Sequence, residues 1–570
     1  MIVKALVFTL TWVALWCLVD TNATLLHIIP SSSNPCPVEL CLTLSQFAAN
    51  TSHYLDSNTT LILQPGNHDL KTELVVANVT EFLIVSNYTI PVKGKVAITQ
   101  SSRFHIVNVT KVYVQAVTFI GFGKNKVKSV DNFTIEHSSF IGRKYGNSHG
   151  VCYTGHRHNY FGTALELVET NATIVNSSFI SNQYGNYRES FGLAKYFHIP
   201  HQSAFVGGAM IVTKSNATII GSYFKNNCAK NGGAIFGEWC SNIAIIGSTF
   251  VDNSAMYSSN YKFSNNFGGA LYLECDQNTQ NSSGSLTING SKFYHNKGYG
   301  HYYKGQGFGY GGALVLYQVS TGISGSDFND NVATSNGGAI FAVNPTRAMI
   351  INGSGFSGNK AFDGGAILTK NSSKVIVDHC NFSSNAVKKY GGATLFDGNA
   401  HIQIHGCHYS KNQADAIAGA IWVVSADFLN ISESQFMDNK NQCHDCKYSA
   451  TINLAYVTTA VLNILFANNK APLLILDSKV TFTGATKFLN NTEFTALRAI
   501  MSEVTINGTC VMMHNFGAAV GGAMIAANSK VYIHGSTTIA NNTARLSGGC
   551  LLYTSPSPRD ATLSRMPSSA

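Results

Sequence analysis

Four histidines and one aspartate are spaced so that they could perform metal or acid–base chemistry. The group consists of His379, His401, His405, His408 and Asp378. If the segments around Cys380 and Cys407 align, Asp378 lies beside His405 and forms an acid–imidazole pair. Such a pair can bind a metal ion or exchange a proton near neutral pH. The alternative is a solvent-facing row of polar side chains, and we predict no catalytic, metal-binding or cofactor-binding residue.

The 13 cysteines fit an oxidising compartment, where disulfides form. Their spacing suggests four disulfides: Cys36 with Cys41, Cys240 with Cys275, Cys380 with Cys407, and Cys443 with Cys446. Cys380 and Cys407 occupy equivalent places, where aligned strands would hold their Cα atoms about 5 Å apart, within the disulfide range. The alternative is buried free thiols. Cys443 and Cys446 form a lone CxxC motif without the second ligand pair of a structural zinc site.

Aromatic and glycine-rich insertions are the candidate recognition surface. The spacing of a repeated phenylalanine grows to 45 residues between Phe179 and Phe224 and to 35 between Phe293 and Phe328. In residues 298–310 the candidate recognition side chains are Tyr299, Tyr302, Tyr303, Phe308 and Tyr310. Insertions of consecutive repeats emerge on one side of a solenoid, and tyrosine with glycine is typical of adaptable binding surfaces. We therefore expect glycans or cell-surface and matrix proteins as partners, with loop variation over a rigid core as the alternative.

A repeated unit must position all of these residues. Each unit reads Ile-x-x-Ser-x-Phe-x-x-Asn, and Gly-Gly-Ala with an apolar residue follows after a variable stretch. Phe356, Phe382, Tyr409 and Phe436 follow one another at intervals of 26, 27 and 27 residues. This period, in short β-rich segments punctuated by Gly and Asn, predicts an all-β, single-stranded, right-handed parallel β-helix. A β-propeller, whose blades are longer and more uniform, is the alternative.

Within each rung the repeat also predicts the interior. We expect the phenylalanines to stack as a core column. The serine two residues before each phenylalanine fits a tight corner. The asparagine three residues after each phenylalanine suits a left-handed turn, and its side chain could join a ladder of amides along the axis.

The paired Gly-Gly-Ala-(Ile/Leu) and Phe-x-x-Asn motifs resemble the repeats of the chlamydial polymorphic outer-membrane proteins. More broadly, the chain resembles pectin-lyase-like right-handed β-helix proteins, including secreted invertebrate ones. The resemblance covers about residues 179–549. It implies surface display or adhesion, because the polymorphic membrane proteins are surface autotransporters implicated in adhesion. The density of glycosylation sequons departs from that family and favours a eukaryotic, invertebrate member.

An enzyme is the alternative function, because pectin-lyase-like β-helices include polysaccharide lyases and glycoside hydrolases. Such enzymes need clustered acids, or an Arg or Lys base beside a calcium site. The chain has only 29 Asp and Glu. Asp327 and Asp330 share one rung, whereas Asp363, Asp397 and Asp415 stand apart. The sequence therefore favours a non-catalytic protein.

The ends of the chain differ from the repeats. Residues 1–23 are predicted to be a signal peptide, because an apolar run follows Lys4 and small residues end it. A membrane anchor is the alternative, although the run is shorter than the roughly 20 residues of a membrane span. Residues 24–60 are predicted to form an N-terminal cap with a short helix, because Thr43 and Gln46 can form a capping box.

The β-helix is predicted over residues 61–549, with regular repeats from about residue 170. Residues 550–570 resemble translated adapter or vector sequence, which predicts that the native C-terminus is missing and leaves membrane association open. Frequent Asn-x-Ser/Thr sequons predict a glycoprotein. The candidates are Asn50, Asn58, Asn78, Asn87, Asn108, Asn132, Asn171, Asn216, Asn281, Asn352, Asn371, Asn381 and Asn430.

The charge of the chain argues against nucleic acid as a partner. A formal net charge of +9 comes from 38 Lys and Arg and 29 Asp and Glu, without basic runs. The charged fraction of 12% is about half that of an ordinary soluble domain, while 45% of residues are hydrophobic, which excludes a disordered chain. We expect an extracellular, secreted or cell-surface protein with a structural, adhesive or recognition role.

Overall fold

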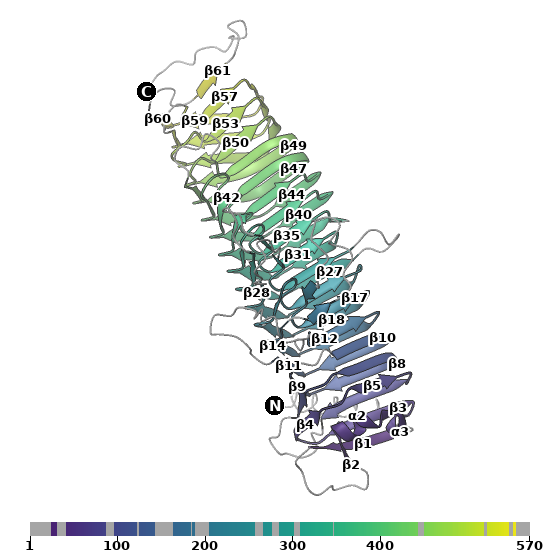
Figure 1. The fold of residues 1–570 in the computed structure, drawn as a ribbon. Coiled ribbons are helices and arrows are strands. Elements are labelled where there is room, and N and C mark those ends of the chain that lie inside the picture. The colour runs from purple at the N-terminus through teal and green to yellow at the C-terminus, as the bar shows by residue number, and fades with distance from the viewer. Residues whose placement is uncertain are drawn as a thin grey trace, which may run out of the picture. The chain divides into compact units, whose positions relative to one another are not determined.

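The structure is a computed structural model that describes residues 24–30, 41–86, 96–121, 125–142, 163–183, 185–187, 204–256, 266–275, 284–300, 308–345, 347–442, 450–517, 521–545 and 551–554. The chain divides into two compact units, Met1–Ser258 (unit 1) and Ser259–Ala570 (unit 2). Each unit consists of short strands that pair in parallel with the equivalent strands of the next rung (Figure 1). The predicted right-handed parallel β-helix is confirmed.

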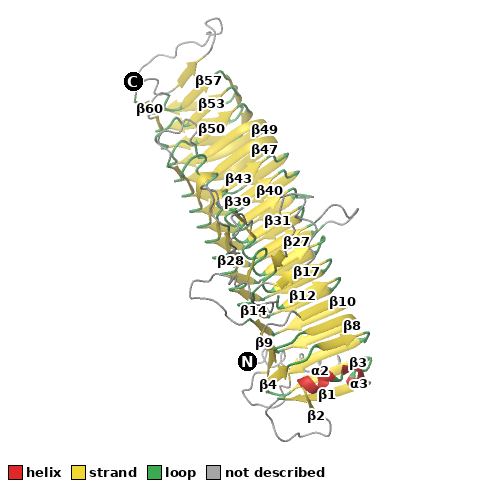
Figure 2. Ribbon diagram, in the orientation of Figure 1, coloured by secondary structure: helices red, strands yellow, loops and turns green. Residues whose placement is uncertain are grey.

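The predicted helical cap lies at the start of unit 1 (Figure 2). Helix α2 (Leu44–Ala49) begins after Thr43, whose Oγ1 accepts a hydrogen bond from the Gln46 amide at 3.3 Å. The Gln46 side chain in turn accepts one from the Thr43 amide at 2.8 Å, which completes the capping box. The helix buries Leu44, Phe47 and Ala48, the three residues expected on its apolar face.

Strands already begin inside the predicted cap. Strand β1 (Thr24–Ile29) pairs in parallel with β2 (Cys41–Thr43) and β3 (Asn58–Leu63). Helix α3 (Thr51–Tyr54) connects α2 to β3. The following strands of unit 1 are β4 (Gly66–Leu70), β5 (Leu74–Ala77), β6 (Glu81–Ser86), β7 (Val96–Gln100), β8 (Phe104–Gln115), β9 (Thr118–Gly121), β10 (Asn125–Glu136) and β11 (Ser139–Ile141). Neither of the two helices in the described part of the chain is long and apolar enough to cross a membrane.

The regular rungs of unit 1 each contain three main strands and, from the second rung, a short fourth one. They are β12 (Leu165–Val168), β13 (Asn171–Val175), β14 (Ser178–Ile180), β17 (Met210–Thr213), β18 (Asn216–Ile220), β19 (Tyr223–Lys225), β20 (Cys228–Ala229), β21 (Ile235–Glu238), β22 (Asn242–Ile246), β23 (Thr249–Val251) and β24 (Ser254–Met256). Strands β15 (Gly185–Tyr187) and β16 (Ala204–Val206) form a separate antiparallel pair in an insertion.

Unit 2 repeats the same rung. Its first-column strands are β26 (Leu271–Glu274), β31 (Leu314–Tyr317), β35 (Ile340–Val343), β39 (Ile367–Lys370), β43 (Thr394–Asp397), β50 (Leu473–Leu476), β53 (Leu497–Ile500), β57 (Met524–Ala527) and β61 (Leu551–Thr554). The second-column strands are β27 (Ser285–Asn289), β32 (Ser320–Ser324), β36 (Met349–Asn352), β40 (Lys374–Asp378), β44 (His401–His405), β51 (Lys479–Phe482), β54 (Glu503–Ile506) and β58 (Lys530–Ile533).

The third-column strands of unit 2 are β28 (Lys292–Tyr294), β33 (Asp327–Asn329), β37 (Gly355–Ser357), β41 (Asn381–Ser383), β45 (His408–Ser410), β52 (Ala485–Leu489), β55 (Thr509–Met513) and β59 (Thr537–Ala540). Two long strands, β47 (Ile421–Met437) and β49 (Ile452–Ala467), run through all three columns. Short additional strands are β25 (Asn266–Phe267), β29 (Lys297–Tyr299), β30 (Gly309–Tyr310), β34 (Val332–Ala333), β38 (Lys360–Asp363), β42 (Ala386–Tyr390), β46 (Gln413–Ala414), β48 (Lys440–Asn441), β56 (Phe516–Gly517) and β60 (Thr543–Ala544).

The strand β61 lies in the segment predicted to be foreign sequence. It pairs in register with β57, from Met524 opposite Leu551 to Ala527 opposite Thr554. Regular pairing therefore continues four residues beyond the predicted boundary at residue 550. The origin of the remaining residues stays a prediction, because residues 555–570 lie outside the described ones.

The Gly-Gly pair of the repeat has two separate steric causes. The first glycine adopts a left-handed backbone, as at Gly337 with φ of +67°. The second lies against the next rung, so that a Cβ on Gly338 would collide with the carbonyl oxygen of Gly365. The alanine that follows is fully buried, for example Ala339. The motif is therefore explained by backbone conformation and close packing.

The predicted amide ladder is present in both units. Asn412 donates from Nδ2 to the Phe382 carbonyl oxygen at 2.9 Å and to Asn439 Oδ1 at 3.0 Å. Its Oδ1 accepts two bonds of 3.0 Å, from the backbone amide and from Nδ2 of Asn385. Every polar atom of this buried side chain is thus satisfied, which removes the penalty of burying it.

The predicted turn conformation of these asparagines is wrong. The left-handed residue is the one before each ladder asparagine, such as Lys411 with φ of 56° before Asn412. The asparagine instead points inward and is fully buried. The exposed residue takes the strained backbone conformation because a turn is needed there, while the asparagine must align with its neighbours in the ladder.

The predicted phenylalanine stack is confirmed within each unit. In unit 1 the rings of Phe179, Phe224 and Phe250 stack at centroid distances of 4.8 and 4.6 Å. In unit 2 the rings from Phe293 to Phe436 stack at 4.5–5.0 Å, with Tyr409 replacing one phenylalanine. These distances match the spacing of about 4.8 Å between neighbouring strands, so each rung adds one ring.

The predicted disulfide between Cys380 and Cys407 is wrong, because both are free thiols. Each sulfur takes the place of the buried serine found in other rungs. Cys380 Sγ donates to the Asp378 carbonyl oxygen at 3.2 Å, and Cys407 Sγ donates to that of His405 at 3.3 Å. The equivalent Ser222 hydroxyl bonds the Ile220 carbonyl oxygen at 2.9 Å. The two side chains therefore point along a hydrogen-bonded column, as serines do, and do not join.

Candidate functional site

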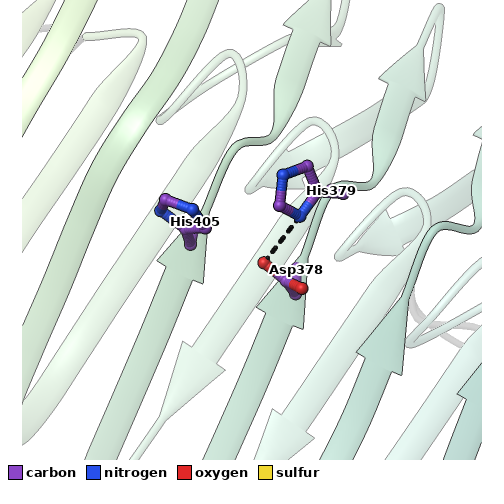
Figure 3. Close-up of side chains that lie close together, drawn as sticks. All are labelled: Asp378, His379 and His405. Atoms are coloured by element: carbon purple, nitrogen blue, oxygen red, sulfur yellow. Dashed lines mark hydrogen bonds and ion pairs between the residues drawn. The ribbon is translucent and has the colours of Figure 1, made fainter.

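Asp378, His379 and His405 lie together at the turn that ends the second-column strands of unit 2 (Figure 3). One ligand atom from each side chain lies within 4.8 Å of the other two. Asp378 Oδ1 and His379 Nδ1 are 2.9 Å apart, and the His379 and His405 rings meet edge to face with centroids 5.2 Å apart. The sequence had placed Asp378 beside His405, and the pairing of β40 with β44 confirms that neighbourhood.

The backbone holds this group in place. Asp378 and His405 face each other because they are register partners on adjacent strands. His379 follows Asp378 in a left-handed turn with φ of 47°, and its amide donates to the His405 carbonyl oxygen at 2.8 Å. The equivalent turn residue of the next rung is Gly406, where a Cβ would lie 2.9 Å from the His379 ring. The glycine therefore leaves room for the imidazole to lie over the neighbouring rung.

Two further polar residues of the next rung complete the surroundings. Ser432, the register partner of His405, has its Oγ 3.0 Å from His405 Nδ1. Glu433 Oε2 lies 4.0 Å from His405 Nε2. Sequence analysis missed both residues. They occupy the positions four and three before Phe436, just as Asp378 and His379 precede Phe382, so alignment on the phenylalanines would have found them.

His401 and His408 lie apart from this group. The His401 ring stacks on Phe428 with centroids 4.7 Å apart. His408 lies on the third-column strand β45 opposite Asn381. Chemically, the remaining group combines two imidazoles with a carboxylate at a partly exposed turn. Such donors suit a borderline transition metal such as zinc better than calcium or magnesium, which prefer oxygen ligands alone.

A second feature of unit 2 is a patch of half-exposed aromatic rings, here called the aromatic patch: Phe362, Tyr390 and Trp422. The Tyr390 and Trp422 rings have centroids 4.1 Å apart at 56°. Lys389 Nζ lies 4.5 Å from the Tyr390 ring centroid and 6.0 Å from that of Phe362, which are cation–π distances. Apolar faces beside donors and acceptors are typical of small-ligand surfaces.

Asp363 lies at the base of the aromatic patch. Its Oδ1 accepts a 3.1 Å hydrogen bond from the Tyr390 amide. Burial raises the pKa of this carboxyl to about 6, although Lys389, the Tyr390 amide and Lys370 act in the opposite direction. Among the described carboxyl groups of unit 2, Asp363 has a pKa raised by burial. Asp397 instead forms an exposed ion pair with Lys370 at 3.2 Å.

Comparisons with known proteins bear on the repeat. Residues 221–238 of unit 1 and residues 325–343 of unit 2 match the Chlamydia polymorphic membrane protein repeat. These two segments are similar to the polymorphic-membrane-protein repeat. Both matched segments run from the turn glycine before the Phe-x-x-Asn motif through the Gly-Gly-Ala-Ile motif. No curated protein matches the sequence.

Several solved β-helix structures are similar to this chain. PfbA, a surface adhesin of Streptococcus pneumoniae, shares 12% identity at a TM-score of 0.26, covering 86% of this chain and 87% of PfbA. The periplasmic alginate epimerase AlgG shares 9% identity at a TM-score of 0.19, and the match covers 90% of this chain and 83% of AlgG. The AlgE4 A-module of Azotobacter vinelandii, a mannuronan C-5 epimerase, shares 9% sequence identity at a TM-score of 0.16. The match covers 86% of this chain and 91% of the AlgE4 module. Likeness at this level transfers neither a site nor an activity.

The predicted recognition loop, residues 298–310, precedes the matched segment of unit 2, and part of it is described. The Tyr310 ring stacks on Phe267 at 5.2 Å and packs against Phe341, so this side chain contributes to internal packing. Tyr299 and Phe308 are half-buried at the two ends of the loop. Tyr302 and Tyr303 lie outside the described residues. A recognition role for this loop stays a prediction.

The remaining cysteine predictions have mixed outcomes. Cys41, Cys228, Cys240 and Cys275 each belong to a disulfide. The proposed pairing of Cys240 with Cys275 stays a prediction. Cys36, the expected partner of Cys41, lies outside the described residues, as do Cys443 and Cys446. Cys228 is not among the cysteines predicted to pair.

Most described sequon asparagines lie on the surface of the repeats. Exposed ones are Asn50, Asn78, Asn108, Asn132, Asn171, Asn216, Asn352, Asn371 and Asn381. Asn58 and Asn430 are half-buried, and Asn87 and Asn281 lie outside the described residues. Glycosylation, and the signal peptide predicted over residues 1–23, stay predictions.

Proposed function

We propose that this chain is a surface-displayed or secreted β-helix protein with an adhesive or recognition role. The observation that carries the proposal is the presence of polymorphic-membrane-protein repeats in both units. The resemblance of these repeats to surface proteins implicated in adhesion supports the role, and the predicted signal peptide supports export.

The distribution of side chains within a rung also supports a binding protein. The phenylalanine, asparagine, serine and Gly-Gly-Ala positions of the repeat are buried and serve to build the solenoid. Outward positions are therefore the ones available for a ligand. Among the described outward residues, the aromatic patch offers flat ring faces next to Lys389 and Asp363, which together suit a sugar ring with its hydroxyl groups. We propose glycans as the ligand class.

The test is binding of the purified full chain to an array of immobilised glycans. We expect binding to a subset, and loss of at least tenfold in affinity in the variant Tyr390→Ala/Trp422→Ala. Tyr532→Ala is the matched control, because this tyrosine is 42% exposed elsewhere on unit 2, and it should bind as the parent does.

Two results would overturn the proposal. Absence of binding to every glycan and to intact cell surfaces would exclude the adhesive role. Release of shortened or unsaturated products from polyuronates by the chain would show instead that it is an enzyme. Retained binding in the double variant would move the binding site away from the aromatic patch and refute its assignment.

A further inference from the structure

We propose that Asp378, His379 and His405 bind a divalent transition-metal ion, with zinc as the best-suited ion. The proposal is independent of glycan binding. It is based on three donors of the right chemistry gathered at one turn: two imidazoles and one carboxylate whose ligand atoms lie within 4.8 Å of one another. Nitrogen and oxygen donors of this kind are common zinc ligands in proteins.

The distances require only small movements. Zinc bonds of about 2.0–2.2 Å in tetrahedral geometry place ligand atoms roughly 3.3–3.5 Å apart. The present distance of 2.9 Å between Asp378 Oδ1 and His379 Nδ1 would increase slightly, and the His405 ring would turn toward these two atoms. The side chains are 32%, 63% and 42% exposed for Asp378, His379 and His405, so solvent leaves them room to rotate.

The backbone and a neighbouring residue prepare the site. Two of the ligands are register partners on paired strands, so their Cα positions are fixed by the sheet. Ser432 Oγ holds His405 Nδ1 at 3.0 Å, which orients the ring and leaves Nε2 as the atom for a metal. Metal-binding histidines are commonly oriented through their second nitrogen in this way.

A fourth ligand is available on the next rung. Glu433 Oε2 lies 4.0 Å from His405 Nε2 on the rung that follows His405, and it would reach the ion by rotation of its side chain, which is 70% exposed. Together with Asp378 it would supply two negative charges to balance a divalent cation. If Glu433 does not close the site, the fourth position is open to water or to a carboxylate of a bound molecule.

The experiment is calorimetric titration of the untagged full chain with zinc chloride. The chain also contains a CxxC motif, so the parent for this experiment carries Cys443→Ser and Cys446→Ser. We expect one zinc ion per chain. His379→Ala and His405→Ala should each weaken zinc binding at least tenfold, and the double variant should abolish it. His405→Gln provides a second variant that keeps a polar side chain of similar reach.

His295→Ala is the matched control. His295 is an exposed histidine in the same left-handed turn conformation, with φ of 53°, on another rung of unit 2. It should leave zinc affinity unchanged. Undiminished zinc binding in the His379→Ala/His405→Ala variant would overturn the proposal, as would loss of all binding in the CxxC-deficient parent. Equal binding of calcium would overturn the choice of metal.

Discussion

Two columns of residues on the same rungs of unit 2 behave in opposite ways. Along one column Asn385, Asn412 and Asn439 are identical and fully buried. Along the turn column three residues before each stacked ring, His379, Gly406 and Glu433 differ at every step. Both columns advance with the same strand spacing, so the geometry of the rung cannot cause the difference.

Hydrogen bonding explains why the asparagine column is constant and the turn column varies. Each asparagine donates to and accepts from its neighbours, so a change at one rung removes hydrogen bonds from buried polar groups of both neighbouring rungs. At the turn, the His379 and Glu433 side chains face solvent, and the backbone amides of His379 and Gly406 make the same sheet hydrogen bond although one residue has an imidazole and the other no side chain. Positions that carry the same residue in every rung thus build the fold. Positions that vary from rung to rung lie on the surface, where a binding site can form.

The strongest test of this comparison is Asn412→Ala. The substitution removes four hydrogen bonds at a fully buried position. The Asn385 backbone amide loses its acceptor, whereas Asn385 Nδ2 and Asn439 Oδ1 each lose one of two partners. We expect the free energy of unfolding to fall by about 2–4 kcal/mol. Urea denaturation would measure it, and faster hydrogen exchange should centre on the rungs from Asn385 to Asn439.

The control for that prediction is the adjacent Lys411→Ala. Lys411 is exposed and already adopts the left-handed backbone, so the change removes only a solvated side chain. We expect an effect within about 0.5 kcal/mol. If Lys411→Ala and Asn412→Ala lowered the free energy of unfolding by similar amounts, the turn side chain would matter as much as the ladder asparagine. That result would contradict the contrast between the two columns.

The interior could be predicted from the sequence because its physics is periodic. Repeated Phe, Asn and Gly-Gly-Ala positions at intervals of 26 and 27 residues require equal environments, and a stack of parallel rungs provides them. The prediction failed where two neighbouring residues share one turn. Both Lys411 and Asn412 are compatible with a turn, and only the ladder determines which of them is buried.

The candidate metal site was predicted in part. Register alone places Asp378 beside His405, and the repeat revealed that register. The contact of His379 with the neighbouring rung depends on the space above Gly406 and on side-chain rotation, which no spacing rule supplies. The aromatic patch was missed for a related reason: Phe362, Tyr390 and Trp422 come from different places in their rungs and share no repeated motif.

The next largest expected effect concerns Asp363, a half-buried acid outside the ladder. Its pKa of about 6 lies above the ordinary value of 3.8, so the folded state binds the proton more tightly than the unfolded state. The stability that this acid contributes is complete below pH 3.8 and is lost as the pH rises through 6. Asp363→Asn keeps an acceptor for the Tyr390 amide and removes the charge.

We therefore expect Asp363→Asn to match the parent near pH 4 and to exceed it at pH 7 by on the order of 1–2 kcal/mol. Thermal unfolding at a series of pH values would measure this difference. Asp397→Asn is the control, because its exposed carboxylate pairs with Lys370, and its removal should change stability only slightly at either pH. A pH-independent effect of Asp363→Asn would show that the carboxyl is not desolvated in the folded protein.

The smallest expected effect is that of the double variant Cys380→Ser/Cys407→Ser. It tests whether the two thiols merely replace the buried serines of other rungs. Serine fills the equivalent position in other rungs, where its hydroxyl bonds the carbonyl oxygen two residues earlier, as each thiol does here. The hydrogen bond with Cys380 and burial raise the pKa of the Cys407 thiol, which disfavours its thiolate form.

We expect the double variant to differ from the parent by less than about 1 kcal/mol in urea denaturation. In the parent, a thiol reagent should label both cysteines only after unfolding, without prior reduction. A loss of about 2–5 kcal/mol, the usual effect of removing a native disulfide, would contradict this expectation. It would mean that the two rungs are held by a covalent bond, and that the change from serine to cysteine in this column has a function of its own.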